Sequence, residues 1–67
     1  MQTILFNNAS LPVEQGLTLA ELLIQQGYGE AGFAVAVNQI FVSRSSYTTY
    51  VINNGDKIDI VVPMQGG

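Results

Sequence analysis

The sequence predicts a small α+β domain in which a mixed sheet wraps around one main helix. Three observations carry this prediction. Two strand-like stretches joined by a tight turn open the chain, one amphipathic helix with a capping signal follows, and three more strand-like stretches complete it. A chain of 67 residues has room for one domain. We expect this domain to span residues 1–63, followed by a flexible tail of residues 64–67.

The first two strands are expected to form a hairpin. Residues 2–6 are rich in strand formers, and Asn7-Asn8 is a dipeptide that tolerates positive φ in a tight turn. The stretch after this turn is again apolar at alternate positions. Pro12 has no N–H to donate to a neighbouring strand, so this second strand is expected at an edge of the sheet.

Thr18 opens the predicted helix. Thr18 and Glu21 fit the capping box, in which a hydroxyl and a carboxylate each accept a hydrogen bond from the other residue's backbone N–H. Gly27 supplies the stop signal at the other end. A helix of about two and a half turns is marginal alone, so its apolar stripe must pack on the sheet. The stripe consists of Leu19, Leu22 and Leu23.

Three further strands are expected after the helix. Residues 33–37 form a continuous apolar run, which is typical of a strand at the centre of a sheet. Residues 40–43 are expected to return as a short strand after a two-residue turn, and the polar residues 44–49 predict a turn or a single helical turn. Residues 57–62 alternate between apolar and charged side chains after a strong Asn-Gly turn, which indicates an amphipathic strand.

The order of these elements indicates a β-grasp, or ubiquitin-like, roll. A hairpin and one helix are followed by more strands, so the sheet must wrap around that helix. The first and last strands are both apolar and both need neighbours, so we expect them to lie side by side. In the last strand Ile58, Ile60 and Val62 are expected to share one face, and Lys57 and Asp59 the other.

Composition argues against several classes of function. The sequence has no cysteine and no histidine, so it forms no disulfide and is not expected to bind a metal ion. Five acids against two bases argue against nucleic acids and anionic membranes as partners, because both need clustered Lys and Arg. No apolar stretch approaches the ~18 residues that cross a membrane, and no secretory signal is present. We therefore expect a cytoplasmic protein.

The most informative feature is Gly66-Gly67, the end of the sequence. It follows an amphipathic strand and Pro63, which is expected to end that strand. Two residues without side chains can thread a narrow channel, so the carboxylate of Gly67 is either a reactive group or only the place where the chain ends. Met64 and Gln65 are expected to extend this tail into a partner's channel.

A second candidate site is a surface for a partner protein. Leu5, Phe41 and Val61 lie either on the outer face of the sheet, where they would form an apolar docking patch, or in the core. Arg44 is either a solvated charge or a further contact with a partner. The three tyrosines are expected to be half-buried packing groups.

Five ordered segments extend along the whole chain. They are MQTILFNN at 1–8, TLAELL at 18–23, VAVN at 35–38 with Val42 and Arg44, NGDKIDI at 54–60, and Gly66-Gly67. Each segment alone is a weak signal, but their order and spacing form a specific combination, which resembles the ThiS-type sulfur carriers of thiamin (thiazole) biosynthesis. Asn54 stands where that family often has Asp, and Met64-Gln65 replaces small residues, while Pro63 resembles the tail of the related MoaD carriers of molybdopterin synthesis.

The resemblance implies that chemistry takes place on Gly67. An E1-like adenylating enzyme of the ThiF type would use ATP to form an acyl-adenylate there, and sulfur from a protein persulfide would replace AMP to give a thiocarboxylate. A ThiG-type thiazole synthase would consume that sulfur. The chain itself would bind no cofactor, would contain no catalytic residue, and would be a protein co-substrate of these enzymes.

Three other functions stay open at this point. The chain could be a MoaD-like sulfur carrier that docks on molybdopterin synthase, which uses the same tail chemistry. It could also be a β-grasp interaction module without covalent chemistry, in which case the diglycine has no function. The last alternative is a ubiquitin-like modifier that is conjugated to lysines of other proteins.

Overall fold

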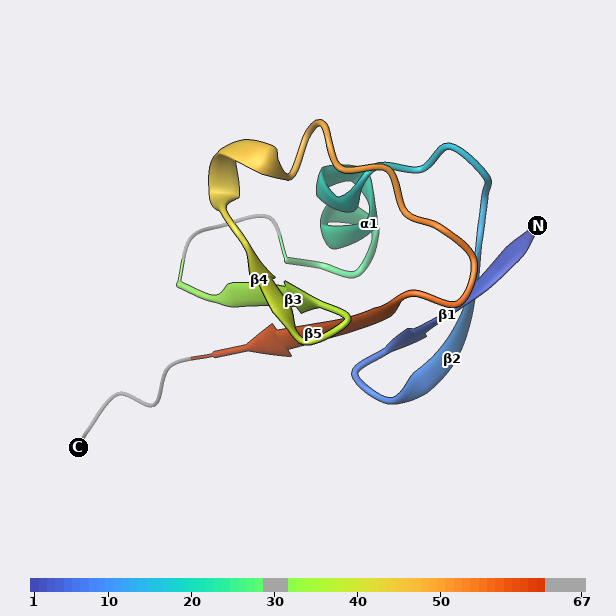
Figure 1. Ribbon diagram of the computed structural model, residues 1–67, viewed down its shortest axis with the longest axis horizontal. Coiled ribbons are helices and arrows are strands. Elements are labelled where there is room, and N and C mark those ends of the chain that lie inside the picture. The colour runs from blue at the N-terminus through green and yellow to red at the C-terminus, as the bar shows by residue number, and fades with distance from the viewer. Residues whose placement is uncertain (29–31, 63–67) are drawn as a thin grey trace.

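One mixed sheet and one α-helix form the two layers of the computed structural model, which describes residues 1–28 and 32–62 (Figure 1). The helix α1 (Leu19–Gln25) lies against one face of the sheet, and a 3-10 helix, η1 (Arg44–Ser46), lies beside it. The expected tail and its boundary at residue 63 fall outside the described ranges. The strands are β1 (Gln2–Phe6), β2 (Ala9–Val13), β3 (Ala34–Val37), β4 (Ile40–Val42) and β5 (Lys57–Val61).

The strand order is β2-β1-β5-β3-β4, which confirms a β-grasp arrangement. The first and last strands lie side by side and run parallel, with Phe6 opposite Ile58, whereas the other neighbouring pairs are antiparallel. Pro12 lies in β2 at one edge, as its missing N–H requires. The apolar strand β3 lies inside the sheet, between β5 and β4.

Two tight turns of the same kind close the two hairpins. Asn7 and Asn8 have φ angles of 51° and 68°, and Asn38 and Gln39 have φ angles of 53° and 70°. Positive φ at both central residues is the type I′ geometry, whose twist matches that of the flanking strands. The predicted turn at Asn7-Asn8 is therefore confirmed.

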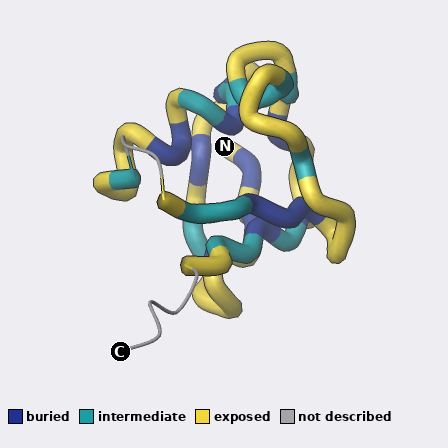
Figure 2. The backbone as a smooth tube through the Cα atoms, turned by 90° about the vertical axis from the view of Figure 1, so that its left-hand side faces the viewer, coloured by how far each residue is buried: buried dark blue, intermediate teal, exposed yellow. Residues whose placement is uncertain are grey.

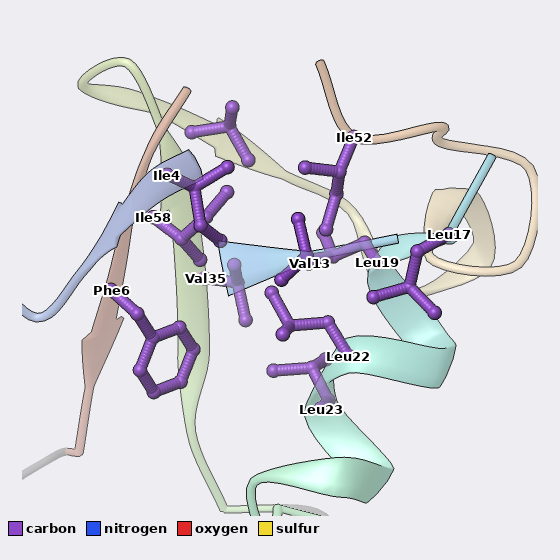
Figure 3. Close-up of a cluster of buried hydrophobic side chains, with 11 residues drawn as sticks. Ile4, Phe6, Val13, Leu17, Leu19, Leu22, Leu23, Val35, Ile52 and Ile58 are labelled. Atoms are coloured by element: carbon purple, nitrogen blue, oxygen red, sulfur yellow. The ribbon is translucent and has the colours of Figure 1, made fainter. Parts of the chain in front are cut away.

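The core lies between α1 and the sheet, and the predicted leucine stripe is confirmed. Leu19, Leu22 and Leu23 are at most 2% exposed, and Figure 3 shows Leu22 and Leu23 pointing toward the sheet residues Ile4 and Val35. Figure 2 shows the buried positions facing the interior and the connecting turns exposed. The alternating burial along β1 shows that one face of the sheet is covered and the other is open.

The first strand has the predicted bounds, whereas the three strands predicted after the helix were each one residue too long at one end. The last ladder pair of β5 is Val61 with Ala34, so Val62 follows the strand and is 62% exposed instead of continuing the face of Ile58 and Ile60. Likewise β3 begins at Ala34 rather than at residue 33, and β4 ends at Val42 rather than at residue 43. The polar stretch after β4 contains η1, a single helical turn as predicted.

The capping box at the start of α1 is also confirmed. The backbone N–H of Glu21 donates to Thr18 Oγ1 at 3.2 Å, and the backbone N–H of Thr18 donates to Glu21 Oε1 at 2.9 Å. Further along, the N–H groups of Leu19 and Ala20 donate to the carbonyls of Tyr50 and Tyr47 at 2.8 and 2.9 Å. The first turn of the helix therefore holds the segment after η1 in place, because its free N–H groups find acceptors there.

A buried carboxylate fixes the start of β5. Asp56 is 7% exposed and accepts hydrogen bonds from Asn38 Nδ2 at 3.1 Å and from the backbone N–H of Asn53 at 2.9 Å. Asn38 Oδ1 in turn accepts from the Lys57 N–H at 3.0 Å. Burial, and secondarily the charge of Asp56, raises the pKa of Tyr50. None of the helices formed by residues 1–28 and 32–62 is long and apolar enough to cross a membrane.

Replacing Leu22 with Ala should destabilise the protein by about 3 kcal/mol, because a fully buried leucine leaves a cavity when it is truncated. Chemical denaturation with a two-state fit measures this loss. The matched control is Ile24→Ala, two residues further along α1, where the side chain is 69% exposed and the expected change is about 0.5 kcal/mol or less. Equal losses for the two variants would contradict the assignment of the core.

Replacing Thr18 with Ala should cost about 1 kcal/mol of stability, because the first turn of α1 loses its side-chain cap. Thr48→Ala, at an exposed position after η1, is the control and should change little. Denaturation midpoints at neutral pH measure both. If Thr48→Ala lowered the stability as much as Thr18→Ala does, the loss could not be attributed to the cap.

The contribution of the Glu21 carboxylate to the cap should depend on pH in one direction. Hydrogen bonds from the Thr18 backbone and then from its side chain lower the pKa of Glu21 below its usual value of 4.5. The stabilisation is therefore present above pH 4.5 and disappears as the pH falls through the lowered pKa of the folded state. Denaturation of Glu21→Gln and the parent protein should differ at pH 7 and converge in acid; a gap that widens in acid would contradict this sign.

Candidate functional site

The predicted tail begins at a well-defined place in the fold. Met64, Gln65, Gly66 and Gly67 lie outside the residues that the structure describes, so their predicted role is not tested by it. The strand that leads to them is β5, which is hydrogen-bonded to β1 on one side and to β3 on the other. Its last pair is Val61 with Ala34, so β5 ends at the edge of the sheet where β3 begins.

The face of the sheet that points away from α1 carries three of the predicted docking residues. The ladder pairs place Leu5 beside Lys57, Ala36 beside both Phe41 and Asp59, and Ala34 beside Val61. All of these residues alternate with core residues such as Ile58 and Val35, so they share the opposite face. We call this the outer face; its central members are Leu5, Ala34, Ala36, Phe41, Lys57, Asp59 and Val61.

Leu5, Phe41 and Val61 are exposed by 41%, 67% and 46%, so the alternative that they belong to the core is wrong. They do not form one continuous patch, however. Val61 lies four residues along β5 from Lys57, the partner of Leu5, which is about 13 Å of strand. The charged side chains of Lys57 and Asp59 fall within that interval.

Phe41 and Val61 are instead connected by small apolar residues. Ala36 pairs with Phe41 and Ala34 pairs with Val61, and both alanines belong to β3 between the two strands. We call these four residues, Ala34, Ala36, Phe41 and Val61, the tail-side patch; its exposed side chains are Phe41 and Val61, whereas Ala36 is only 7% exposed. This apolar surface lies beside the point where the tail begins, whereas Leu5 lies further away on the same face.

Arg44 lies apart from this patch. It belongs to η1, and with Leu23 and Tyr47 it lines a hollow of about 140 Å³ on the helix side of the sheet. The structure therefore divides the predicted docking residues between two surfaces. Tyr28, Tyr47 and Tyr50 pack against the core and are half-buried, as predicted.

Sequence reasoning missed two strongly exposed isoleucines. Ile40 is 71% exposed in the edge strand β4, and Ile24 is 69% exposed on α1. Ile40 comes directly after a two-residue turn, which is a local signal of exposure, whereas the helical stripe pattern gave no warning for Ile24. Among residues 1–28 and 32–62, no three acidic side chains come together in a way that could hold a metal ion.

Comparison with known proteins identifies the family. Residues 2–67 match the model of the ThiS family, and this match includes Gly66 and Gly67. The chain is 36% identical over 64 residues to the sulfur carrier protein ThiS of Escherichia coli (strain K12), covering 96% of this chain and 97% of that protein. Its fold is similar to the crystal structure of the thiamine biosynthesis protein ThiS from Geobacter metallireducens, with a TM-score of 0.85 at 22% identity over 98% of this chain and 100% of the other. The chain therefore belongs to the ThiS family.

Proposed function

We propose that this protein carries sulfur as a thiocarboxylate on Gly67 for the synthesis of the thiazole of thiamin. The observation that supports this most directly is the match to the family model, which covers residues 2–67 and so includes the diglycine. The similar protein of Escherichia coli is named a sulfur carrier. The protein is a co-substrate of other enzymes in this proposal and acts in the cytoplasm.

The chemistry requires the carboxylate of Gly67 to be activated first. A carboxylate resists nucleophiles because its charge is delocalised, so an E1-like adenylating enzyme of the ThiF type joins it to AMP from ATP and releases pyrophosphate. The outer sulfur of a persulfide on a donor protein then attacks the carbonyl carbon, and AMP leaves. A thiol cleaves the resulting sulfur–sulfur bond, which leaves the thiocarboxylate that a ThiG-type thiazole synthase consumes.

The composition of the chain suits this chemistry. The sequence contains no cysteine, so no thiol of its own can attack the activated Gly67 and divert it into a thioester. Pro63 and the glycines give a tail in which only Met64 and Gln65 carry long side chains. These two side chains must fit the channel of the adenylating enzyme.

The tail-side patch supplies a surface on which the same enzyme docks. Phe41 and Val61 are exposed apolar side chains next to the strand end from which the tail starts. Burial of such side chains against a partner removes apolar surface from water and holds the tail at a fixed distance from the partner's catalytic site.

Incubation of the protein with ATP, the adenylating enzyme and a persulfide donor should give the mass increase of an oxygen-to-sulfur exchange at Gly67. Intact-protein mass spectrometry measures it, and fragmentation locates it. Two variants test the site: deletion of Gly67 and addition of residues after it should each abolish the exchange. An exchange that persists in both variants would contradict the proposal, and isopeptide adducts on other proteins would indicate a modifier instead.

Replacing Phe41 with Ala should weaken binding to the adenylating enzyme about tenfold, because a 67% exposed aromatic side chain at an interface commonly contributes more than ~1 kcal/mol. Leu5→Ala, on the same outer face but outside the tail-side patch, is the control and should weaken binding less than about threefold. Isothermal titration calorimetry with both variants measures the two constants. A larger effect for Leu5 would move the docking surface to the other end of the sheet.

A further inference from the structure

A hollow beside Arg44 lies on the helix side of the sheet. It lies between α1, η1 and the residue before β3. Among the described residues in its lining, Arg44 is the one charged side chain, and the others are apolar or aromatic. We call it the Arg44 hollow; its main lining residues are Leu23, Ile24, Tyr28, Phe33, Arg44 and Tyr47.

The volume of the hollow sets the size of its occupant. At about 140 Å³ it is smaller than the sites that hold cofactors or nucleotides, which measure roughly 300–1,000 Å³. An apolar cavity of about 150 Å³ takes up one benzene molecule. The Arg44 hollow therefore fits one side chain of the size of phenylalanine or leucine, which is how an interface anchors its main residue.

The aromatic wall of the hollow is formed before any partner binds. Tyr28 and Phe33 meet edge to face with ring centroids 5.6 Å apart, and Tyr28 also meets the buried Phe6 at 6.0 Å. Ile24 completes the rim and is 69% exposed. An occupant would cover this exposed isoleucine, which no described part of the chain does.

Arg44 gives the hollow a preference in charge. It is one of two cations in a chain with five acids, and it is exposed. Within residues 1–28 and 32–62, the side-chain hydrogen bonds around η1 join Ser43 to Ser45 and Ser46 and do not involve the guanidinium. A planar guanidinium beside an apolar hollow favours a carboxylate next to the inserted side chain.

The position of the hollow relates it to the tail. Phe33 directly precedes Ala34, and Ala34 pairs with Val61 at the strand end from which the tail starts. The hollow is thus at the tail end of the sheet, but on the helix side and not on the outer face. A protein that receives the tail stands close to it.

We propose that the Arg44 hollow anchors a protein partner that receives the tail. The hollow takes one phenylalanine- or leucine-sized side chain of that partner, and Arg44 binds the carboxylate of an adjacent Asp or Glu. The identity of the partner rests on the proposed sulfur-carrier function, whereas the affinity of the hollow for such a group does not.

The first test is an NMR titration of the isotope-labelled full chain with phenylacetate, which combines a ring and a carboxylate. Amides of the lining residues should shift with a dissociation constant in the millimolar range, as expected for a ligand of this size. Benzyl alcohol, which keeps the ring without the charge, should bind at least about threefold more weakly. Acetate should cause no shifts there. Equal binding of phenylacetate and benzyl alcohol would overturn the role of Arg44.

Two substitutions separate the charge from the hollow. Arg44→Gln should weaken phenylacetate binding about three- to tenfold and leave benzyl alcohol unchanged. Lys57→Gln is the matched control, because it removes the other cation from the outer face and should leave both unchanged. Ala20 of α1 also lines the hollow, and Ala20→Leu, which fills it with a residue of similar helix propensity, should abolish both. If Arg44→Gln and Lys57→Gln weakened phenylacetate binding equally, the net charge of the protein would account for the effect, and the proposal would be overturned.

The second test measures the affinity of the adenylating enzyme for the carrier without ATP. Arg44→Gln and Ala20→Leu should each raise the dissociation constant about three- to tenfold. Unchanged constants for both variants would overturn the proposed partner. Lining amides that shift with carrier concentration alone would instead identify a second copy as the occupant, which also overturns it. Neither test involves sulfur transfer, so a failure of the thiocarboxylate experiment is distinguishable from a failure here.

Discussion

The pairing of the first strand with the last is the constraint on which the rest of the structure depends. In the order β2-β1-β5-β3-β4, β5 is the link between two hairpins that share no other ladder. The leucine stripe of α1 covers this junction from one side, and the core joins Ile4, Val35 and Ile58 from three different strands. Removing β5 would leave two separate hairpins and a helix without a surface to cover, and none of these is stable alone.

A strand with neighbours on both sides is also a rigid base for a tail. β5 delivers the chain to Val61 at a fixed position, with the tail-side patch on the outer face and the Arg44 hollow on the helix side. A partner that binds the tail could therefore also contact the tail-side patch, the Arg44 hollow or both. The small size of the domain is no disadvantage in the proposed role, since the proposed recognition uses the side chains around one strand end and not a deep cleft.

Local signals in the sequence predicted most of the fold. The capping box at Thr18, the Asn7-Asn8 turn and the edge position of Pro12 each depend on residues that are neighbours in the chain, and each is present in the structure. Alternation in β5 predicted two faces, but the register of the strands against one another could not be derived from the sequence, so the exposure of Phe41 in β4 stayed undecided. The bounds of β1 were correct, but β3, β4 and β5 were each predicted one residue too long, because the end of a ladder is set by the partner strand.

The position of Arg44 on the helix side could not be predicted from neighbouring residues in the sequence, for a related reason. η1 is held near α1 by the bond from the Ala20 N–H to the Tyr47 carbonyl, and Asp56 is bonded to Asn38 across 18 residues. Such contacts join segments that are far apart in the sequence, and no local pattern in either segment predicts the contact. For the tail residues that bear the proposed chemistry the situation is reversed. They were predicted from the sequence pattern, and the fold shows only where the strand before them ends.

The late position of β5 in the chain has a consequence for synthesis. β5 leaves the ribosome after the other described strands, so the sheet closes only once residues 57–61 are available. Val61 and the alanines opposite it come together at the same moment. A chain that lacks β5 would therefore also lack the tail-side patch.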